Sequence, residues 1–165
     1  DLKPDNVLQC NSAWVLVDLG SCSAFEAPLQ DRRDCLALQD FAAEHCTLSY
    51  RAPELWQPQI GDARRGAADI FALGALCWAL AFGYSPFESE LRARGPVIVE
   101  SSHSRALSAP APPPRSSICL RRYPGFYSPL IEVARRLFVA EPASRPGARD
   151  ALGLVRGLAA GGEAV

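Results

Sequence analysis

Four polar residues near the start of the chain have the types and spacing that metal and phosphate chemistry requires. Asp1, Lys3 and Asn6 fall within one short stretch, and Asp18 follows it. Carboxylate and amide oxygens are the ligands that a hard divalent cation such as Mg²⁺ prefers, and the Lys3 ammonium could face the phosphates that this ion neutralises. The residues therefore fit a metal and phosphate site. A solvated turn is the alternative interpretation of the same residues.

Two short strands are predicted to bring these residues together. Pro4 fixes a turn before residues 7–9, and residues 13–17 are apolar and rich in β-branched side chains, as a partner strand would be. In such a hairpin, Asn6 and Asp18 lie near the same end.

The rest of the chain must pack around an apolar stretch at residues 69–82. Every position from Ile70 to Phe82 is apolar or glycine, so no face of a helix formed there could be left in water. The run makes only about 20 Å of helix against roughly 30 Å of bilayer hydrocarbon, which favours a buried core helix over a membrane hairpin. Asp69 is expected to lie at the edge of this core and to accept hydrogen bonds from backbone N–H groups.

The composition limits the class of protein. The 165 residues suit one domain, and 17 Lys and Arg against 18 Asp and Glu give no field that would favour nucleic acid or an anionic membrane. The six cysteines show no CxxC pair, so we expect reduced thiols in a cytoplasmic setting. Because the chain lacks methionine and begins with Asp1, we also expect it to be a fragment whose upstream part is missing.

Five separated motifs occur in the order found in one large enzyme family. They are Asp1-Leu2-Lys3-Pro4-Asp5-Asn6, then Asp18-Leu19-Gly20, Ala52-Pro53-Glu54, Asp69 with Gly74, and Arg145. Together they closely resemble the C-terminal lobe of a eukaryotic protein kinase, over nearly the whole chain. Residues 17–21, 38–43, 46–54 and 81–83 also resemble the Numb-associated kinase group and, within it, the serine/threonine kinase 16-like branch.

The resemblance implies a mainly α-helical fold: a kinase C-lobe with helices around a buried central helix and a small β-hairpin at the active site, the N-lobe being missing. Residues 1–160 would form this domain and residues 161–165 a tail. Its parts would be a catalytic loop at 1–9, an activation segment at 18–54, the core helix at 69–82, a loop insert at 95–127 and terminal helices at 128–160.

The resemblance also implies a role for each polar residue in the transfer of the ATP γ-phosphoryl group to Ser or Thr hydroxyls of a protein substrate. Asp1 would accept the proton of that hydroxyl, and Lys3 would contact the γ-phosphate. A lysine at this position is the usual mark of a Ser/Thr rather than a Tyr kinase. Asn6 and Asp18 would ligate Mg²⁺ and so complete the ATP site.

Other parts of the nucleotide site follow the same resemblance. Leu8 and Val17 match positions that line the adenine pocket from below, and ordinary core packing is compatible with both. Leu19 stands where phenylalanine is usual and Phe71 where tryptophan is common, and both changes keep an apolar side chain. The chain has no glycine-rich loop, no strand Lys with a helix Glu partner and no His-Arg before Asp1. As given, we expect it to bind ATP poorly and to turn over nothing measurable.

The activation segment is predicted to contain a helix. Leu38, Phe41 and Ala42 have helical spacing within residues 36–46, where the Numb-associated group has an extra helix. This helix would hold the substrate platform without a phosphate. His45 is expected to be a surface or packing residue rather than a catalyst.

Three further residues would complete the site and its support. Thr47 matches the threonine that hydrogen-bonds the catalytic Asp and Lys, an exposed loop hydroxyl being the alternative. Glu54 and Arg145 match a buried ion pair that ties the activation segment to the late helices.

The last third of the chain is predicted to be less regular. We expect a surface helix near residues 89–94, irregular structure over 95–127, and helices at 128–140 and 148–159. The proline-rich stretch at 109–115 fits an SH3 or WW ligand or a solvated loop.

Two predictions concern the whole protein. The alternative function is a non-catalytic scaffold, either a truncated lobe or a pseudokinase that binds partner proteins. The resemblance to the branch further implies an N-terminal lipid and a Golgi or other membrane location, carried by residues upstream of Asp1.

Overall fold

The computed structural model describes residues 1–23, 28–62, 66–92, 95–108 and 127–161. It is mainly helical, with two small antiparallel hairpins. The longer helices are α1 (Arg32–His45), α3 (Ala67–Phe82), α6 (Tyr127–Leu137) and α7 (Ala148–Gly161). The short helices are α2 (Pro53–Trp56) and α4 (His103–Ala106), with 3₁₀ turns η1 (Pro4–Asn6), η2 (Leu19–Ser21), η3 (Leu48–Tyr50) and η4 (Pro142–Ser144). The strands are β1 (Val7–Cys10), β2 (Ala13–Leu16), β3 (Ser89–Arg92) and β4 (Gly95–Ile98).

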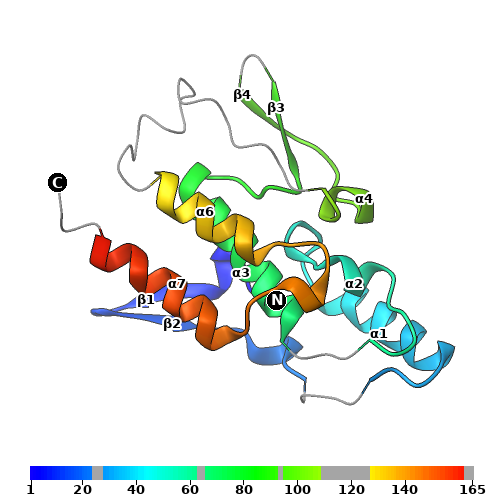
Figure 1. Ribbon diagram of the computed structural model, residues 1–165. Coiled ribbons are helices and arrows are strands. Elements are labelled where there is room, and N and C mark those ends of the chain that lie inside the picture. The colour runs from blue at the N-terminus through cyan, green and yellow to red at the C-terminus, as the bar shows by residue number, and fades with distance from the viewer. Residues whose placement is uncertain (24–27, 63–65, 93–94, 109–126, 162–165) are drawn as a thin grey trace.

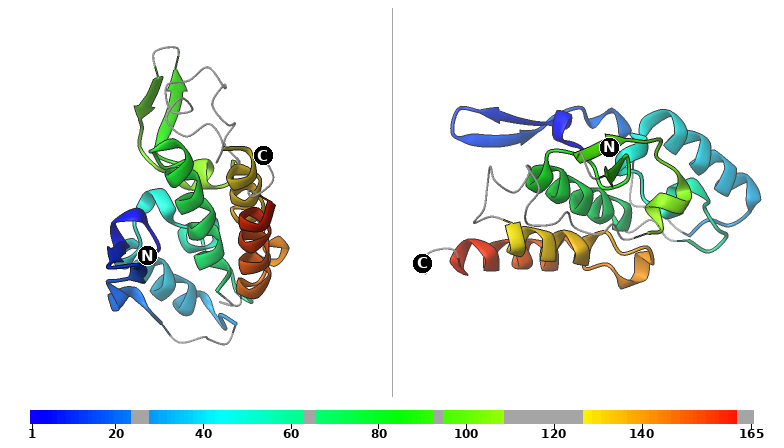
Figure 2. Two further views of the ribbon diagram at one scale, coloured as in Figure 1. Left: turned by 90° about the vertical axis from the view of Figure 1, so that its left-hand side faces the viewer. Right: turned by 90° about the horizontal axis from the view of Figure 1, so that it is seen from above.

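Helix α3 is the centre of the fold, which confirms the predicted core helix. It begins two residues earlier than predicted, after Gly66, and ends at Phe82, where the N–H of the capping residue Gly83 donates to the carbonyl of Ala79 at 2.7 Å. Both glycines have positive φ, a conformation that non-glycine residues rarely adopt. Figure 2 shows α3 between the N-terminal elements on one side and α6 and α7 on the other.

Close packing of α3 against α6 depends on one glycine. A Cβ at Gly74 would lie 2.8 Å from the backbone nitrogen of Phe138 and 2.9 Å from the Cβ of Leu137. The aromatic ring of Trp78 then meets that of Phe138 edge-on, with 5.8 Å between ring centroids. The two helices therefore pack closely against each other, next to the N-terminal elements.

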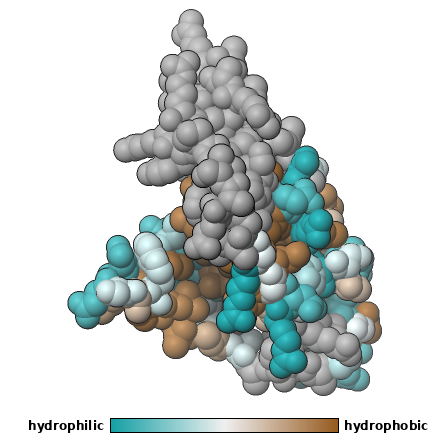
Figure 3. Space-filling view, turned by 60° about the vertical axis from the view of Figure 1, so that its left-hand side comes forward, coloured by the Kyte–Doolittle hydropathy of each residue, from teal (hydrophilic) through white to brown (hydrophobic). Residues whose placement is uncertain are grey.

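The predicted hairpin at the start of the chain is also confirmed. Strands β1 and β2 pair antiparallel, with Val7 opposite Leu16 and Cys10 opposite Ala13. The hairpin extends to one side of the molecule in Figure 1. Its apolar side chains stay largely in water, as the 71% exposed side chain of Trp14 shows. Figure 3 turns this side of the molecule forward, and hydrophobic surface is visible there.

Two predictions for the last third of the chain are wrong. Residues 89–92 form strand β3, not a surface helix, and they pair with β4, which lies within the stretch predicted to be irregular. Gly95 and Pro96 break a helix, and the β-branched Val97 and Ile98 favour a strand. Pairing with this strand therefore overrides the helix propensity of residues 89–92. Helix α4 also lies within that stretch. The proline-rich stretch at 109–115 is outside the described residues.

In the described part of the chain, no helix combines the length and the apolar character needed to cross a bilayer. The described cysteines are free thiols: Cys10, Cys22, Cys35, Cys46 and Cys77.

Candidate active site

The turn η1 and the hairpin gather the polar residues of the N-terminal stretch. The backbone N–H of Asn6 donates to the carbonyl of Lys3 at 3.1 Å, and the Asn6 carbonyl accepts from the N–H of Val17 at 2.9 Å. The side chain of Asn6 is buried, and its Nδ2 donates to the carbonyl of Asp1 at 2.9 Å. Asn6 thereby links the start of the chain to the end of β2, directly before Asp18.

Asp1, Lys3 and Thr47 form a closed cluster of contacts. The Lys3 Nζ lies 2.8 Å from the Asp1 Oδ2 and donates to the Thr47 Oγ1 at 2.8 Å. The backbone N–H of Thr47 donates to the Asp1 Oδ1 at 2.7 Å. The Asp1 side chain is 11% exposed and the Lys3 side chain 22%, so both reach solvent from a largely enclosed position. The structure thus unites two residues of the predicted catalytic loop with one from the predicted activation segment, 44 positions beyond Lys3.

Asn6 and Asp18 supply the oxygen donors that a magnesium ion needs. The Asn6 Nδ2 is engaged as a donor to Asp1, which leaves its carbonyl oxygen as the acceptor that could bind a cation. Asp18 is exposed and has φ 57°, a left-handed conformation that a short polar side chain tolerates. This all-oxygen donor set fits a hard divalent ion. In the described residues, no group of three or more His, Cys, Asp or Glu could hold a metal.

The two predicted adenine-lining residues have different surroundings. Val17 is half-buried, whereas the side chain of Leu8 is 51% exposed. Core packing is therefore the wrong interpretation of Leu8 in this structure. Its apolar side chain is open to a ligand or to another part of the protein.

Glu54 and Arg145 form a bidentate ion pair. The Arg145 Nη1 and Nη2 donate to the two carboxylate oxygens at 2.6 and 2.8 Å. The Arg145 side chain has no exposed surface, and it also donates to the carbonyls of Ala67, Val139 and Ala140. The pair joins α2, the first residue of α3 and the loop after α6.

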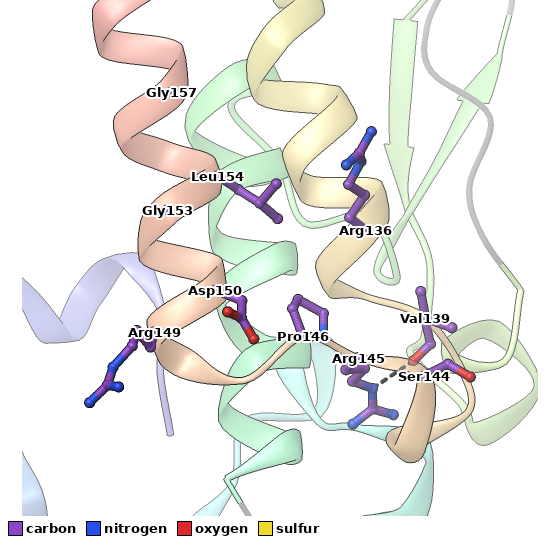
Figure 4. Close-up of a pocket in the computed structure, with 10 residues that line it drawn as sticks. All are labelled: Arg136, Val139, Ser144, Arg145, Pro146, Arg149, Asp150, Gly153, Leu154 and Gly157. Carbon is purple, nitrogen blue, oxygen red and sulfur yellow. Dashed lines mark hydrogen bonds between the residues drawn. The ribbon is translucent and has the colours of Figure 1, made fainter.

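A shallow groove lies between α6 and α7, next to Arg145 (Figure 4). Figure 4 shows the Arg145 side chain turned toward the carbonyl of Val139, at the end of the groove. Arg145 is the only predicted site residue in its lining. The other lining residues are Arg136, Val139, Ser144, Pro146, Arg149, Asp150, Gly153, Leu154 and Gly157.

The hydrogen bonds expected at Asp69 stay a prediction. Its side chain is exposed, and no described residue donates a hydrogen bond to its carboxylate. Asp69 lies in the first turn of α3, where a negative charge is favourable beside the unpaired N–H groups of the helix terminus.

The helix predicted within residues 36–46 is present and begins earlier than predicted. Helix α1 begins at Arg32 because Asp31 caps it: the Asp31 Oδ1 accepts from the N–H of Asp34 at 3.0 Å. Leu38 and Ala42 are buried, and the ring of His45 packs on Phe41 with 4.5 Å between ring centroids.

Sequence reasoning missed Arg51, which is 6% exposed and holds the end of α1. Its Nη2 donates to the carbonyl of Cys46 at 2.7 Å, and its guanidinium lies 4.8 Å from the ring centroid of Trp56. Burial lowers the pKa of Arg51 and raises the pKa of Cys46. No local pattern in the sequence marks Arg51 as buried. Sequence reasoning gave no role to Ser85 either.

Comparison with known proteins identifies relatives of this chain. The model of the protein kinase domain family matches residues 1–154. Serine/threonine-protein kinase 16 of Mus musculus is 31% identical over 147 residues, which cover 88% of this chain and 44% of the relative. Serine/threonine-protein kinase ppk13 of Schizosaccharomyces pombe is 31% identical over 154 residues, with 92% and 41% covered.

A third relative, serine/threonine-protein kinase ENV7 of Saccharomyces cerevisiae, is 29% identical over 159 residues, with 96% and 41% covered. The chain therefore spans less than half the length of these curated relatives. Because the family model covers nearly every described element, from the Asp1 cluster to α7, the chain belongs to the protein kinase domain family.

Proposed function

We propose that this chain is the C-lobe of a serine/threonine protein kinase of the Numb-associated group, in the kinase 16-like branch. With a nucleotide-binding lobe present, it transfers the γ-phosphoryl group of ATP to Ser or Thr hydroxyls of proteins. The observation that carries the proposal is the cluster of Asp1, Lys3 and Thr47, whose contacts span 2.7 to 2.8 Å.

The cluster leaves hydrogen-bonding groups of Asp1 and Lys3 available for a substrate. The Asp1 carboxylate accepts from Thr47, Lys3 and, weakly, Asn6, yet each carboxylate oxygen has two lone pairs, so it can also accept the proton of an incoming hydroxyl. The Lys3 ammonium uses two of its three hydrogens on Asp1 and Thr47. The third remains available for a phosphate oxygen. Positioning and charge neutralisation of this kind are most of what phosphoryl transfer requires.

Asn6 and Asp18 would hold Mg²⁺ through their side-chain oxygens, next to the phosphates. The ion, when bound, neutralises phosphate charge and orients the transferring group. The exposed face of Leu8 and the half-buried Val17 supply apolar surface of the kind on which an adenine ring can rest.

The test is a phosphoryl-transfer assay on the protein encoded by the complete transcript, with Mg-ATP and peptides that carry Ser, Thr or Tyr. We expect transfer to Ser or Thr peptides, and its loss in Asp1→Asn with nucleotide binding nearly intact. Retained turnover in Asp1→Asn would overturn the role of Asp1. Transfer to Tyr peptides alone would overturn the substrate class.

A scaffold is the second candidate function, favoured by the exposed apolar hairpin. Leu8, Trp14 and Leu16 are 51%, 71% and 47% exposed, and surface of this kind is typical of interaction sites. If the transcript encodes an initiator methionine a few codons before Asp1 and no nucleotide-binding lobe, the scaffold becomes the better proposal. A membrane or Golgi location through an upstream lipid rests on the resemblance alone, and fractionation of cells expressing the complete protein tests it.

A further inference from the structure

Ser85 lies in the loop after α3 and has no accessible surface. Its hydroxyl donates to the carbonyl of Ser49 at 2.7 Å, across 36 positions of sequence. The same oxygen accepts from the backbone N–H of Phe87 at 3.3 Å. A buried hydroxyl that donates and accepts in this way has one orientation, so Ser85 is a fixed point between two loops.

The loop that carries Ser85 packs against the hydrophobic core. Phe87 is 2% exposed, and its ring stacks on that of Phe71 in α3 with 5.1 Å between ring centroids. Phe87 also meets Phe138, beyond the end of α6, with 5.9 Å between ring centroids. The hydroxyl of Ser85 is therefore held by the packed core and not by solvent-exposed backbone.

The carbonyl that Ser85 holds belongs to the segment that completes the Asp1 cluster. Ser49 lies in η3, two residues after Thr47, and the backbone N–H of Tyr50 closes this turn by donating to the carbonyl of Thr47 at 3.1 Å. On the other side of Thr47, the guanidinium of Arg51 holds the carbonyl of Cys46. Thr47 is thus bracketed by two carbonyls, each anchored by a buried side chain.

We propose that Ser85 is a positioning residue that holds Thr47 against Asp1 and Lys3. It touches neither the substrate nor the reacting atoms. It fixes η3 and thereby the position of Thr47. In that position the Thr47 N–H donates to the Asp1 carboxylate and the Thr47 hydroxyl accepts from the Lys3 ammonium. The catalytic consequence rests on the proposed kinase function, whereas the geometric claim does not.

Ser101 offers a matched control. It too is buried, and its hydroxyl donates to a backbone carbonyl, that of Phe87, at 3.2 Å. Ser101→Ala therefore removes a buried hydrogen bond to the loop that carries Ser85. It leaves the hydrogen bond from Ser85 to η3 in place. A merely structural role for Ser85 predicts that both alanine variants behave alike.

The first experiment measures amide hydrogen exchange and ¹H–¹⁵N spectra of the 165-residue chain. In Ser85→Ala, we expect the Thr47 amide to exchange about tenfold faster relative to the α3 amides, and its resonance to move upfield as its bond to Asp1 lengthens. In Ser101→Ala, the Thr47 amide should keep its shift and its protection. Equal changes in both variants, or no change at Thr47 in Ser85→Ala, would overturn the proposal.

A second variant keeps the test decisive if Ser85→Ala does not fold. Ser85→Cys places a weaker donor at the same position, and Thr47 protection should then fall part of the way. Unchanged Thr47 protection in Ser85→Cys counts against the proposal.

The second experiment uses the complete protein. Ser85→Ala should lower kcat about tenfold with little change in the KM for ATP, because the misplaced group belongs to the substrate side of the site. Ser101→Ala should keep the wild-type kcat. If the wild-type protein transfers no phosphoryl group, the proposed function fails, while the exchange experiment still decides whether Ser85 positions Thr47.

Discussion

At the scale of single residues, the Glu54–Arg145 pair is the contact whose loss should cost most. Glu54→Gln keeps the shape of the side chain but leaves the fully buried Arg145 guanidinium without an opposite charge. We expect a loss of about 3–5 kcal/mol of unfolding free energy, because an uncompensated buried charge is expensive. Urea denaturation monitored by circular dichroism measures it.

Glu132→Gln is the control for this prediction. Glu132 pairs with Arg136 at 3.1 Å one turn along α6, but both side chains are about 60% exposed. Exposed pairs of this type contribute roughly 0.3–0.5 kcal/mol to stability, so Glu132→Gln should leave the urea concentration at the unfolding midpoint nearly unchanged. Equal losses in the two variants would contradict a special cost of burial.

Tyr50 makes stability depend on alkaline pH. Burial, with the charges of Glu88 and Asp5, raises the pKa of Tyr50 to about 12. The folded state therefore favours the protonated phenol, so its contribution is complete below pH 10 and is lost as the pH rises from about 10 to 12. The loss is at most about 3 kcal/mol.

Thermal melts at pH 9 and pH 11.5 test this dependence. Tyr50→Phe cannot ionise, so its melting temperature should fall less between the two pH values than that of the wild type. Cys77, whose pKa burial raises to about 11, remains in both proteins and accounts for part of the residual decline. An identical decline in the two proteins would show that Tyr50 does not contribute.

The sequence could predict which polar residues the fold brings together at the candidate site, but not the residues that support them. Asp1, Lys3, Asn6 and Thr47 lie in recognisable motifs, and the structure brings them together. The anchoring by Arg51 and Ser85 depends on which carbonyls reach them after folding, over separations of 5 and 36 positions. Neither contact leaves a local pattern that composition or spacing could reveal.

At the scale of elements, the α3–α6 contact predicts opposite effects for two glycines. Gly74→Ala would force a methyl group to within 3 Å of the backbone of α6 and the residue after it, and should cost about 3 kcal/mol. Gly153→Ala in α7 meets no atom within 4 Å and should gain roughly 0.5–1 kcal/mol from helix propensity. Melting temperatures of the two variants check both signs. A tolerated Gly74→Ala would mean that the helices can move apart.

The elements also show where sequence patterns stop being sufficient. The core helix was predictable because its residues are apolar on every side, so a helix formed there has to be largely buried. Strand β3 was not, because Ser89, Glu90, Leu91 and Arg92 have no strand pattern of their own and become a strand only by pairing with β4. Long-range pairing of this kind overrides local propensity.

At the scale of the whole molecule, the candidate site spans parts of very different expected stability. Helix α3 is buried along most of its length, whereas β1 and β2 form a two-stranded hairpin with Leu8 and Val15 exposed on one face and Trp14 and Leu16 on the other. An isolated two-stranded hairpin is at best marginally stable in water, so we expect it to open well before the core unfolds.

Hydrogen exchange at increasing sub-denaturing urea measures this difference. Hairpin amides should exchange through a local opening that depends weakly on urea, and α3 and α6 amides only through global unfolding. Since Asn6 and Asp18 flank the hairpin, its opening would separate the two predicted magnesium ligands, so millimolar Mg²⁺ should slow exchange in β1 and β2 more than in α3. The same exchange rate with and without Mg²⁺ would contradict the assignment of these ligands, and hairpin exchange at the global rate would show that the hairpin is part of the cooperative core.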